Sequence, residues 1–373
     1  MRKTLLVGAL LAGFTGSALA ETSVTLYGLL DTGLIYQRAK VGRTDDARGA
    51  NGGDYQSRFG LQSGQQSGSR WGMRGVEDLG NGMSANFVLE SGFSVNSGRH
   101  EQDSRLFGRR ATVGLNSAAG SLDFGRQTNV ASRYFETIDP FALDFYQANM
   151  GTTFGAANTV RYDNSVVYET PIYAGFQFAA GYSFAFDESD DQVVGFRTKE
   201  NNRAATTGVR YTDGPLQVAL TYDQQFRKPN QPQPKQAIVG AAYDFEVAKI
   251  SAAYGWGRDG ALSGAGLPLA DGREDNRNGL GGTNGDFTWN GLKVNSYMVG
   301  VSAPIGATTA LFGSWQRAKP NEGLTPTNVY SVGSTYELSK RTNLYAYGSY
   351  AQNYAFIDGN RATTVGLGVR HQF

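Results

Sequence analysis

Side chains suited to acid–base or nucleophilic chemistry are scarce in this chain. Its 373 residues include two histidines and no cysteine. A hydrolase usually needs a base such as histidine beside its nucleophile, but His100 and His371 lie in distant segments without a suggestive serine or aspartate nearby. The acids within 271–275 lack the spacing of a calcium loop, although incidental calcium in a loop stays open. We expect no enzyme activity, no metal site and no cofactor.

Arginine is the charged residue that recurs in segments with the alternating pattern of a strand. Arginines alternate with apolar residues in 69–75 and in 109–115, and the side chains of a strand point alternately to its two faces. If Trp71 and Met73 lie on one face, the neighbouring arginines lie on the other. The side chains that this parity collects on the polar face are Arg70, Arg74, Arg110 and Thr112.

The elements that carry these arginines have the dimensions of membrane-crossing strands. In the last ten residues, Val365, Leu367, Val369 and Phe373 alternate with small or polar residues. Ten residues at about 3.3 Å each, when tilted, match the thickness of a bilayer core. One such strand by itself could also be the amphipathic edge of a soluble sandwich.

The opposite end of the chain favours the membrane. Residues 1–20 are predicted to be a cleaved signal peptide, because Arg2 and Lys3 precede a short apolar run and small residues end at Ala20. That run is shorter than the roughly 20 residues of a spanning helix. We expect the mature chain, 21–373, to form one barrel domain. Without Arg2 and Lys3 it holds 32 basic and 33 acidic residues, and this near balance argues against a nucleic-acid partner.

The composition fits a β-barrel better than a compact soluble domain. Mean hydropathy is only −0.38, yet the chain holds 50 glycines, 20 tyrosines and 21 phenylalanines. In a barrel only alternate residues face lipid, so the average looks soluble, while aromatic residues collect at the two membrane interfaces.

Connections between the strand-like segments alternate between short and long. The short ones lie at 78–82, 117–120, 171–175, 213–214, 244–246, 304–306 and 338–341, and the long polar ones at approximately 38–66, 97–104, 128–158, 187–203, 227–235, 258–291, 319–327 and 353–360. This is typical of an antiparallel up-and-down barrel with periplasmic turns and external loops. We predict an all-β transmembrane barrel of about 16 strands, with Asp31 and Glu90 facing a water-filled lumen.

Several segments resemble the general diffusion porins of betaproteobacteria, most closely those of the Bordetella and Comamonas type. The matching segments are 23–28 with Asp31, 69–75 with 77–80, 107–111 with 113–115, 125–127, 161–166 with Tyr168, 336–342 with Tyr345, and 369–373. Together they extend over essentially the whole mature chain. The resemblance implies a homotrimer of sixteen-stranded barrels in the outer membrane of a Gram-negative bacterium. It also implies that the third external loop, 128–158, folds into the lumen as a constriction.

A constriction selects ions by charge where the solute passes within about a Debye length, roughly 8 Å, of the wall. Arg126 and Arg161 end and begin the strands that flank the third loop. The basic side is therefore predicted to be Arg70, Arg74, Arg110, Arg126 and Arg161, with Arg105, Arg109 and Arg133 in reserve. The acidic side, on the loop, is predicted to be Glu136, Asp139 and Asp144. For each arginine, a solvated rim position or a lipopolysaccharide contact stays open.

The excess of basic candidates predicts an anion-preferring channel for passive diffusion of ions and small hydrophilic solutes. The resemblance to anion-preferring porins supports this. The alternatives are a substrate-specific channel with a lumenal binding site and, last, an exported soluble binding module. Expected partners are lipid, lipopolysaccharide and, through Phe373, the machinery that assembles barrels; for Phe373, an interface aromatic without a signalling role is the alternative.

Overall fold

The computed structural model describes residues 23–40, 55–186, 200–228, 230–260, 290–321, 323–356 and 358–373. The predicted signal peptide and the acids within 271–275 lie outside these ranges. The strands are β1 Ser23–Lys40, β2 Tyr55–Ser63, β3 Arg70–Gly80, β4 Met83–Gly92, β5 Arg110–Ser117, β6 Gly120–Thr128, β7 Arg161–Glu169, β8 Phe176–Ser183, β9 Arg203–Asp213, β10 Leu216–Phe226, β11 Lys235–Asp244, β12 Lys249–Arg258, β13 Lys293–Ile305, β14 Thr309–Pro320, β15 Thr327–Ser339, β16 Thr342–Gln352 and β17 Arg361–Gln372.

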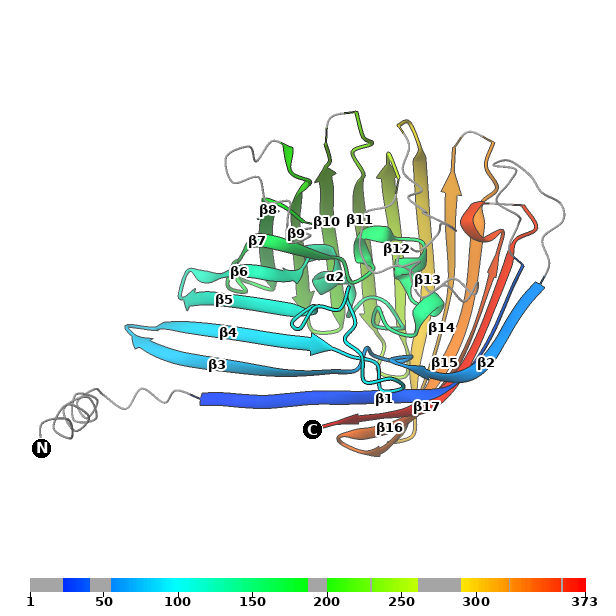
Figure 1. Ribbon diagram of the computed structural model, residues 1–373, viewed down its shortest axis with the longest axis horizontal. Helices are drawn as coiled ribbons and strands as arrows, with labels where there is room; N and C mark the ends of the chain where they lie inside the picture. Colours follow the sequence, from blue (N-terminus) through cyan, green and yellow to red (C-terminus); the bar gives the residue numbers. More distant parts are fainter. Residues whose placement is uncertain are drawn as a thin grey trace, which may run out of the picture.

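The sheet closes on itself. Neighbouring strands pair antiparallel in chain order, and β17 pairs with β1, for instance Leu367 with Leu34. Strands β2 and β3 both pair with β1, along successive stretches, and so form two halves of one wall strand. The seventeen strand segments of the described residues thus build a closed sixteen-strand barrel, which confirms the predicted fold class (Figure 1).

The two faces of the wall follow the predicted alternation. Leu26 and Leu220 on the outer face are 63% and 50% exposed, whereas Asp31 and Asp223 on the inner face are fully buried. This is the pattern that a barrel needs when lipid surrounds it and polar groups fill its interior. None of the helices in the described part of the chain is long and apolar enough to cross a membrane.

Each of the seven short connections predicted from the sequence lies at a link of two to six residues between consecutive strands. One long connection differs from the prediction. Residues 55–63, which the sequence pattern placed inside a join over 38–66, form strand β2. The backbone of β2 pairs with β1 from Thr32 to Lys40, and this pairing satisfies hydrogen-bonding groups that a loop would leave to water.

The connection between β6 and β7, residues 129–160, packs against the inner face of the wall; we call it the inner loop. It contains helix α2 Val130–Phe135 and three short 3-10 turns, η2 Tyr146–Ala148, η3 Met150–Thr152 and η4 Gly155–Ala157. Asn129 caps α2 by accepting a hydrogen bond from the Ser132 amide at 3.2 Å. Figure 1 shows these elements within the ring of strands.

Two apolar clusters hold the inner loop on the wall. At its start, α2 packs on β9 and β10, where Tyr134 and Phe135 join a buried cluster with small inward-facing residues such as Ala219 and Ala253. At its tip, Phe141 and Phe145 pack against the inward rings of Phe312, Tyr345 and Tyr347 on β14 and β16. Because the start and the tip of the loop are both buried in this way, the segment between them is held against the inner face of the wall.

Candidate functional site

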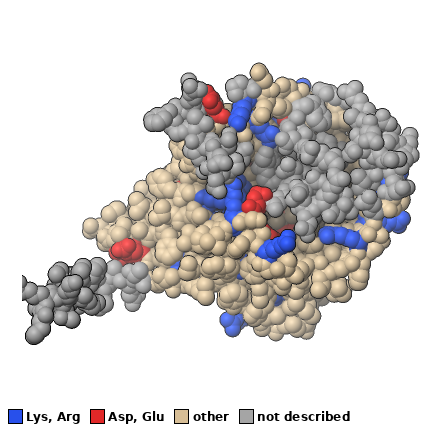
Figure 2. Space-filling model, in the orientation of Figure 1, with Lys and Arg blue, Asp and Glu red and all other residues tan. Residues whose placement is uncertain are grey.

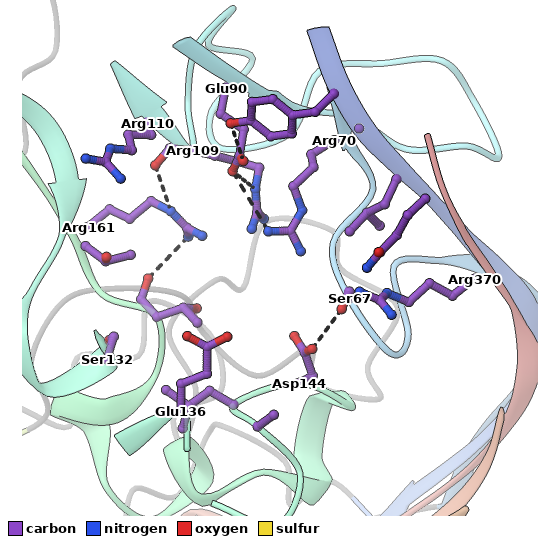
Figure 3. Close-up of a pocket in the computed structure, with 18 of the residues that line it drawn as sticks. Ser67, Arg70, Glu90, Arg109, Arg110, Ser132, Glu136, Asp144, Arg161 and Arg370 are labelled. Atoms are coloured by element: carbon purple, nitrogen blue, oxygen red, sulfur yellow. Dashed lines mark hydrogen bonds and ion pairs between the residues drawn. The ribbon is translucent and has the colours of Figure 1, made fainter. Parts of the chain in front are cut away.

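A charged pocket of about 550 Å³ lies between the inner loop and the wall strands β3, β5 and β7. Among the described residues that line it are six arginines and three acids: Arg70, Arg109, Arg110, Arg133, Arg161, Arg370, Glu90, Glu136 and Asp144. Figure 3 shows Arg70, Arg109, Arg110 and Arg161 along one side of the pocket and Glu136 and Asp144 across from them. The arrangement matches two charged rows that face each other across a lumen.

The centre of the basic side is a carboxylate held between two guanidiniums. Glu90 Oε1 lies 2.7 Å from Arg109 Nε and 4.0 Å from Arg70 Nη1. The hydroxyl of Tyr27 donates a hydrogen bond to the second oxygen of Glu90 at 3.0 Å. One acid therefore fixes two arginines and leaves this group with a net positive charge.

The flanks of the basic side are held differently. Arg161 donates from Nε to the carbonyl of Arg109 at 3.1 Å and from Nη1 to the carbonyl of Thr159 at 3.2 Å. These neutral acceptors orient its guanidinium and leave its charge uncompensated. Arg110 instead forms an ion pair with Asp123 at 3.2 Å. Arg161 is thus the stronger source of positive potential in the pocket.

The acidic side is carried by the tip of the inner loop. Asp144 Oδ2 accepts a hydrogen bond from Ser67 Oγ at 2.8 Å. Burial raises the pKa of Asp144 from 3.8 to about 7, an effect that the charge of Arg70 and the hydrogen bond of Ser67 oppose. Glu136 is exposed on the same side of the pocket. The charge of this side therefore changes near neutral pH.

Some residues predicted for the basic and acidic sides lie outside this pocket. Arg74 is exposed and lies over the ring of Tyr27 at 5.4 Å. Arg126 lies at a bulge of β6, between Gly125 and Gln127, and its guanidinium forms an ion pair with Asp163 at 2.5 Å.

Asp139 is buried inside the inner loop. It accepts backbone hydrogen bonds from Leu143 at 2.9 Å and Met150 at 3.1 Å, and burial raises its pKa to about 6. It shapes the loop and does not reach the pocket.

The remaining lumen-facing predictions have distinct positions. Glu90 lies on the pocket wall, as described above, and Thr112 is buried beside it, where it accepts a hydrogen bond from Arg110 Nε at 3.0 Å. Asp31 is buried and binds Tyr345 and the Ser67 amide. The terminal Phe373 pairs with Gly28 on β1 through two backbone hydrogen bonds, with its ring half-exposed on the outer face.

Comparison with known proteins assigns the family. The sequence profile described as Gram-negative porin matches residues 8–356. The chain belongs to the Gram-negative porin family. An outer membrane porin protein of Bordetella pertussis is 52% identical over the whole of both chains. Outer membrane porin protein 32 of Delftia acidovorans is 33% identical, covering 98% of this chain and 92% of its own.

Solved structures agree with this assignment. The anion-selective porin from Comamonas acidovorans superposes with a TM-score of 0.71 at 28% identity, covering 95% of this chain and 100% of its own. The predicted resemblance, the outer-membrane location and the function as a channel for passive diffusion are confirmed. The homologues are channels, and among the described residues no group of three or more His, Cys, Asp or Glu side chains is placed to hold a metal.

Three arginines of the porin's pocket were not among the main sequence candidates. Arg109 and Arg133 are the reserve candidates, and Arg370 belongs to the small or polar residues that alternate along the last strand. The inward direction of Arg370 follows from strand parity. Its neighbour Val369 faces outward at 40% exposure, and successive side chains of a strand point to opposite faces. Arg133 has no such signal, because it lies on α2 and reaches the pocket only through the folding of the inner loop.

The surface of the porin agrees with this concentration of charge. In Figure 2 most of the described surface in view is neither acidic nor basic, and basic and acidic side chains lie together near the middle of the face. A low charge density over the outer face is what lipid contact requires.

The titration of Asp144 gives a testable pH dependence. Above a pH of about 7 its carboxylate is ionised and opposes the arginines; below that value it is protonated and neutral. Acidification from about pH 8 to about pH 6 is therefore expected to raise the anion-to-cation permeability ratio about two- to fivefold. Reversal potentials in planar bilayers at graded pH measure this. The change should vanish in Asp144→Asn, and a change of equal size in that variant would contradict the assignment.

Proposed function

We propose that this porin is an anion-preferring general diffusion channel, and that its constriction is the pocket between the arginine side and the inner loop. The observation that carries the proposal is the excess of guanidinium over carboxylate groups in that pocket. Anions that approach within about a Debye length, roughly 8 Å, are stabilised there and cations are repelled. The anion-selective porin of Comamonas acidovorans, which has the same fold, supports the proposal.

The two facing rows also act on uncharged solutes. A transverse field between guanidiniums and carboxylates orients dipolar molecules, so polar nutrients pass readily. Apolar molecules must displace water that this field orders. Small hydrophilic solutes are therefore the class transported, and the porin carries out no catalytic step on them.

A salt gradient across a planar bilayer tests the proposal. With a permeant salt such as KCl, the reversal potential should have the sign of anion preference, and cation preference would overturn the proposal. Conductance should rise linearly with salt and remain unblocked by added solutes. Block by a millimolar or micromolar ligand would instead identify the alternative, a substrate-specific channel.

The assembly of the porin follows the same family pattern. It forms a homotrimer after removal of residues 1–20, with lipid and lipopolysaccharide around it. The outer face of β2, where Phe59 and Leu61 are 72% and 64% exposed, supports a contact through the first strands. A trimer should migrate in detergent gels as an oligomer that dissociates on heating, and a monomer before heating would contradict it.

The terminal Phe373 is proposed to belong to the signal that barrel-assembly machinery recognises. Its deletion is expected to reduce strongly the amount of porin in the outer membrane, measured by fractionation and blotting. Phe373→Leu provides the control, because it keeps the two backbone hydrogen bonds to Gly28 and removes only the ring. Unchanged yield of both variants would show that the residue is only an interface aromatic.

A further inference from the structure

The wall strand formed by β2 and β3 contains more residues than its neighbour β1 requires. Ser63 pairs with Thr32 and Arg70 pairs with Leu29, so only two residues of β1 face the whole of 64–69. An antiparallel pair matches one residue with one, and the surplus must leave the sheet. It leaves at Gly64, whose φ of +68° suits glycine. We call residues 64–69 the inner strap, because their contacts lie on the lumen side.

The inner strap is anchored on Asp31. The amide of Ser67 donates to Asp31 Oδ2 at 2.6 Å, and the Tyr345 hydroxyl donates to Oδ1 at 2.5 Å. The amide of Gly64 donates to the Asp31 carbonyl at 2.8 Å. Asp31 is fully buried, and a buried carboxylate satisfied in this way strongly fixes the groups that bind it.

The same strap contacts both charged sides of the pocket. Ser67 Oγ donates to Asp144 at 2.8 Å, and Arg70 Nε donates to the carbonyl of Gly68 at 3.0 Å. A Cβ on Gly68 would lie only 2.8 Å from Arg109 Nη1, so the backbone here is packed directly against the arginine side. Figure 3 shows Ser67 beside Asp144 at the edge of the pocket.

We propose that the inner strap, anchored on Asp31, fixes the distance between Asp144 and the arginine side and thereby sets the charge selectivity of the porin. Ser67 and Asp31 are positioning residues, since they act through Asp144 and not on the solute. This inference rests on the proposed function, because it assigns a specificity determinant to the same constriction.

The strap explains how a loop tip keeps a fixed charge geometry. The aromatic cluster holds Phe145 on the wall, but apolar packing does not direct a carboxylate. A hydrogen bond from a serine that is itself bound to the wall supplies that direction. Without the Ser67 hydroxyl, the Asp144 carboxylate keeps only its Coulomb interactions with the arginines. The charged form is then less stabilised, and the pKa of Asp144 rises.

The test compares Ser67→Ala with the parent porin in planar bilayers, by reversal potentials measured at graded pH. In the parent, the selectivity should change with a midpoint near the titration of Asp144. In Ser67→Ala this midpoint should move upward by about one pH unit. The double variant with Asp144→Asn should behave as Asp144→Asn alone, since the serine acts through that carboxylate. Ser121→Ala, at the start of β6 and outside the pocket, should match the parent.

Two results overturn the inference: a parent without a pH-dependent change, or a Ser67→Ala variant with an unshifted midpoint. A parent that prefers cations but shows the upward shift in Ser67→Ala would overturn the proposed anion preference and support the strap. Asp31→Asn provides a second measurement. Because this substitution weakens the anchor of the strap, the noise of the open-channel current should increase. If Asp31→Asn fails to fold, Ser67→Ala still decides the question, because its substitution leaves the anchor intact.

Discussion

Replacing Arg161 with glutamate should abolish the anion preference of this porin. A unit charge about 5 Å from a passing ion contributes about 0.8 kcal/mol in water, and the substitution changes the local charge by two. A passing anion is therefore destabilised by about 1.6 kcal/mol and a cation is stabilised by the same amount, so the anion-to-cation permeability ratio should fall by roughly two orders of magnitude at low salt, and less at high salt because of screening. Arg161 is chosen because its hydrogen bonds go to backbone carbonyls and leave its charge uncompensated.

Arg74→Glu is the matched control for this experiment. It makes the same change in charge on the wall, but Arg74 is exposed and lies outside the pocket. The reversal potential of Arg74→Glu should stay close to that of the parent. Equal effects of the two substitutions would show that selectivity follows the overall lumen charge and not the pocket.

Replacing Phe145 with alanine is expected to release the tip of the inner loop. Its ring contacts those of Phe141, Phe312, Tyr345 and Tyr347 with centroid distances between 5.3 and 5.9 Å. Removal of a buried phenylalanine ring typically costs about 3–5 kcal/mol. Because the barrel is held by its own strand pairing, this loss falls on the docking of the loop. Single-channel conductance and its fluctuations should both increase.

Single-channel recordings of Phe145→Ala and Phe178→Ala test this expectation. Phe178 lies on the outer face of β8, 46% exposed, so its replacement removes an aromatic ring without touching the loop. Only Phe145→Ala should alter the conductance, while both variants should retain the heat-modifiable mobility of a folded barrel. A parent-like conductance in Phe145→Ala would show that α2 alone holds the loop.

Strand parity could be read from the sequence because it depends on local geometry alone. Side chains alternate along any strand, so Arg70 and Arg110 could be placed in the lumen without knowledge of their neighbours. The same rule would place Arg370 there. The prediction for Arg126 rests on its place at a strand end beside the third loop and not on parity; in the structure it lies at a bulge of β6, where Asp163 binds its guanidinium.

Charges on the inner loop could not be placed by such a rule. Asp139 and Asp144 are five positions apart on one loop, yet one caps backbone amides inside it and the other faces the arginines. Their roles depend on the turns that the loop makes after docking on the wall. Residues 64–69 likewise carry no sequence signal for leaving the sheet, since the surplus exists only relative to the register of β1.

The sequence by itself determined the barrel, its membrane-facing surface and the basic character of its lumen, because alternation and turn chemistry are properties of neighbouring residues. Only the tertiary structure decided which charges meet in the pocket. Asp31, Ser67 and Asp144 come from three separate segments, and Arg161 lies across the pocket from Asp144 on a fourth. Their distances are set by ring closure and by the packing of the inner loop, which depend on contacts between residues far apart in the chain.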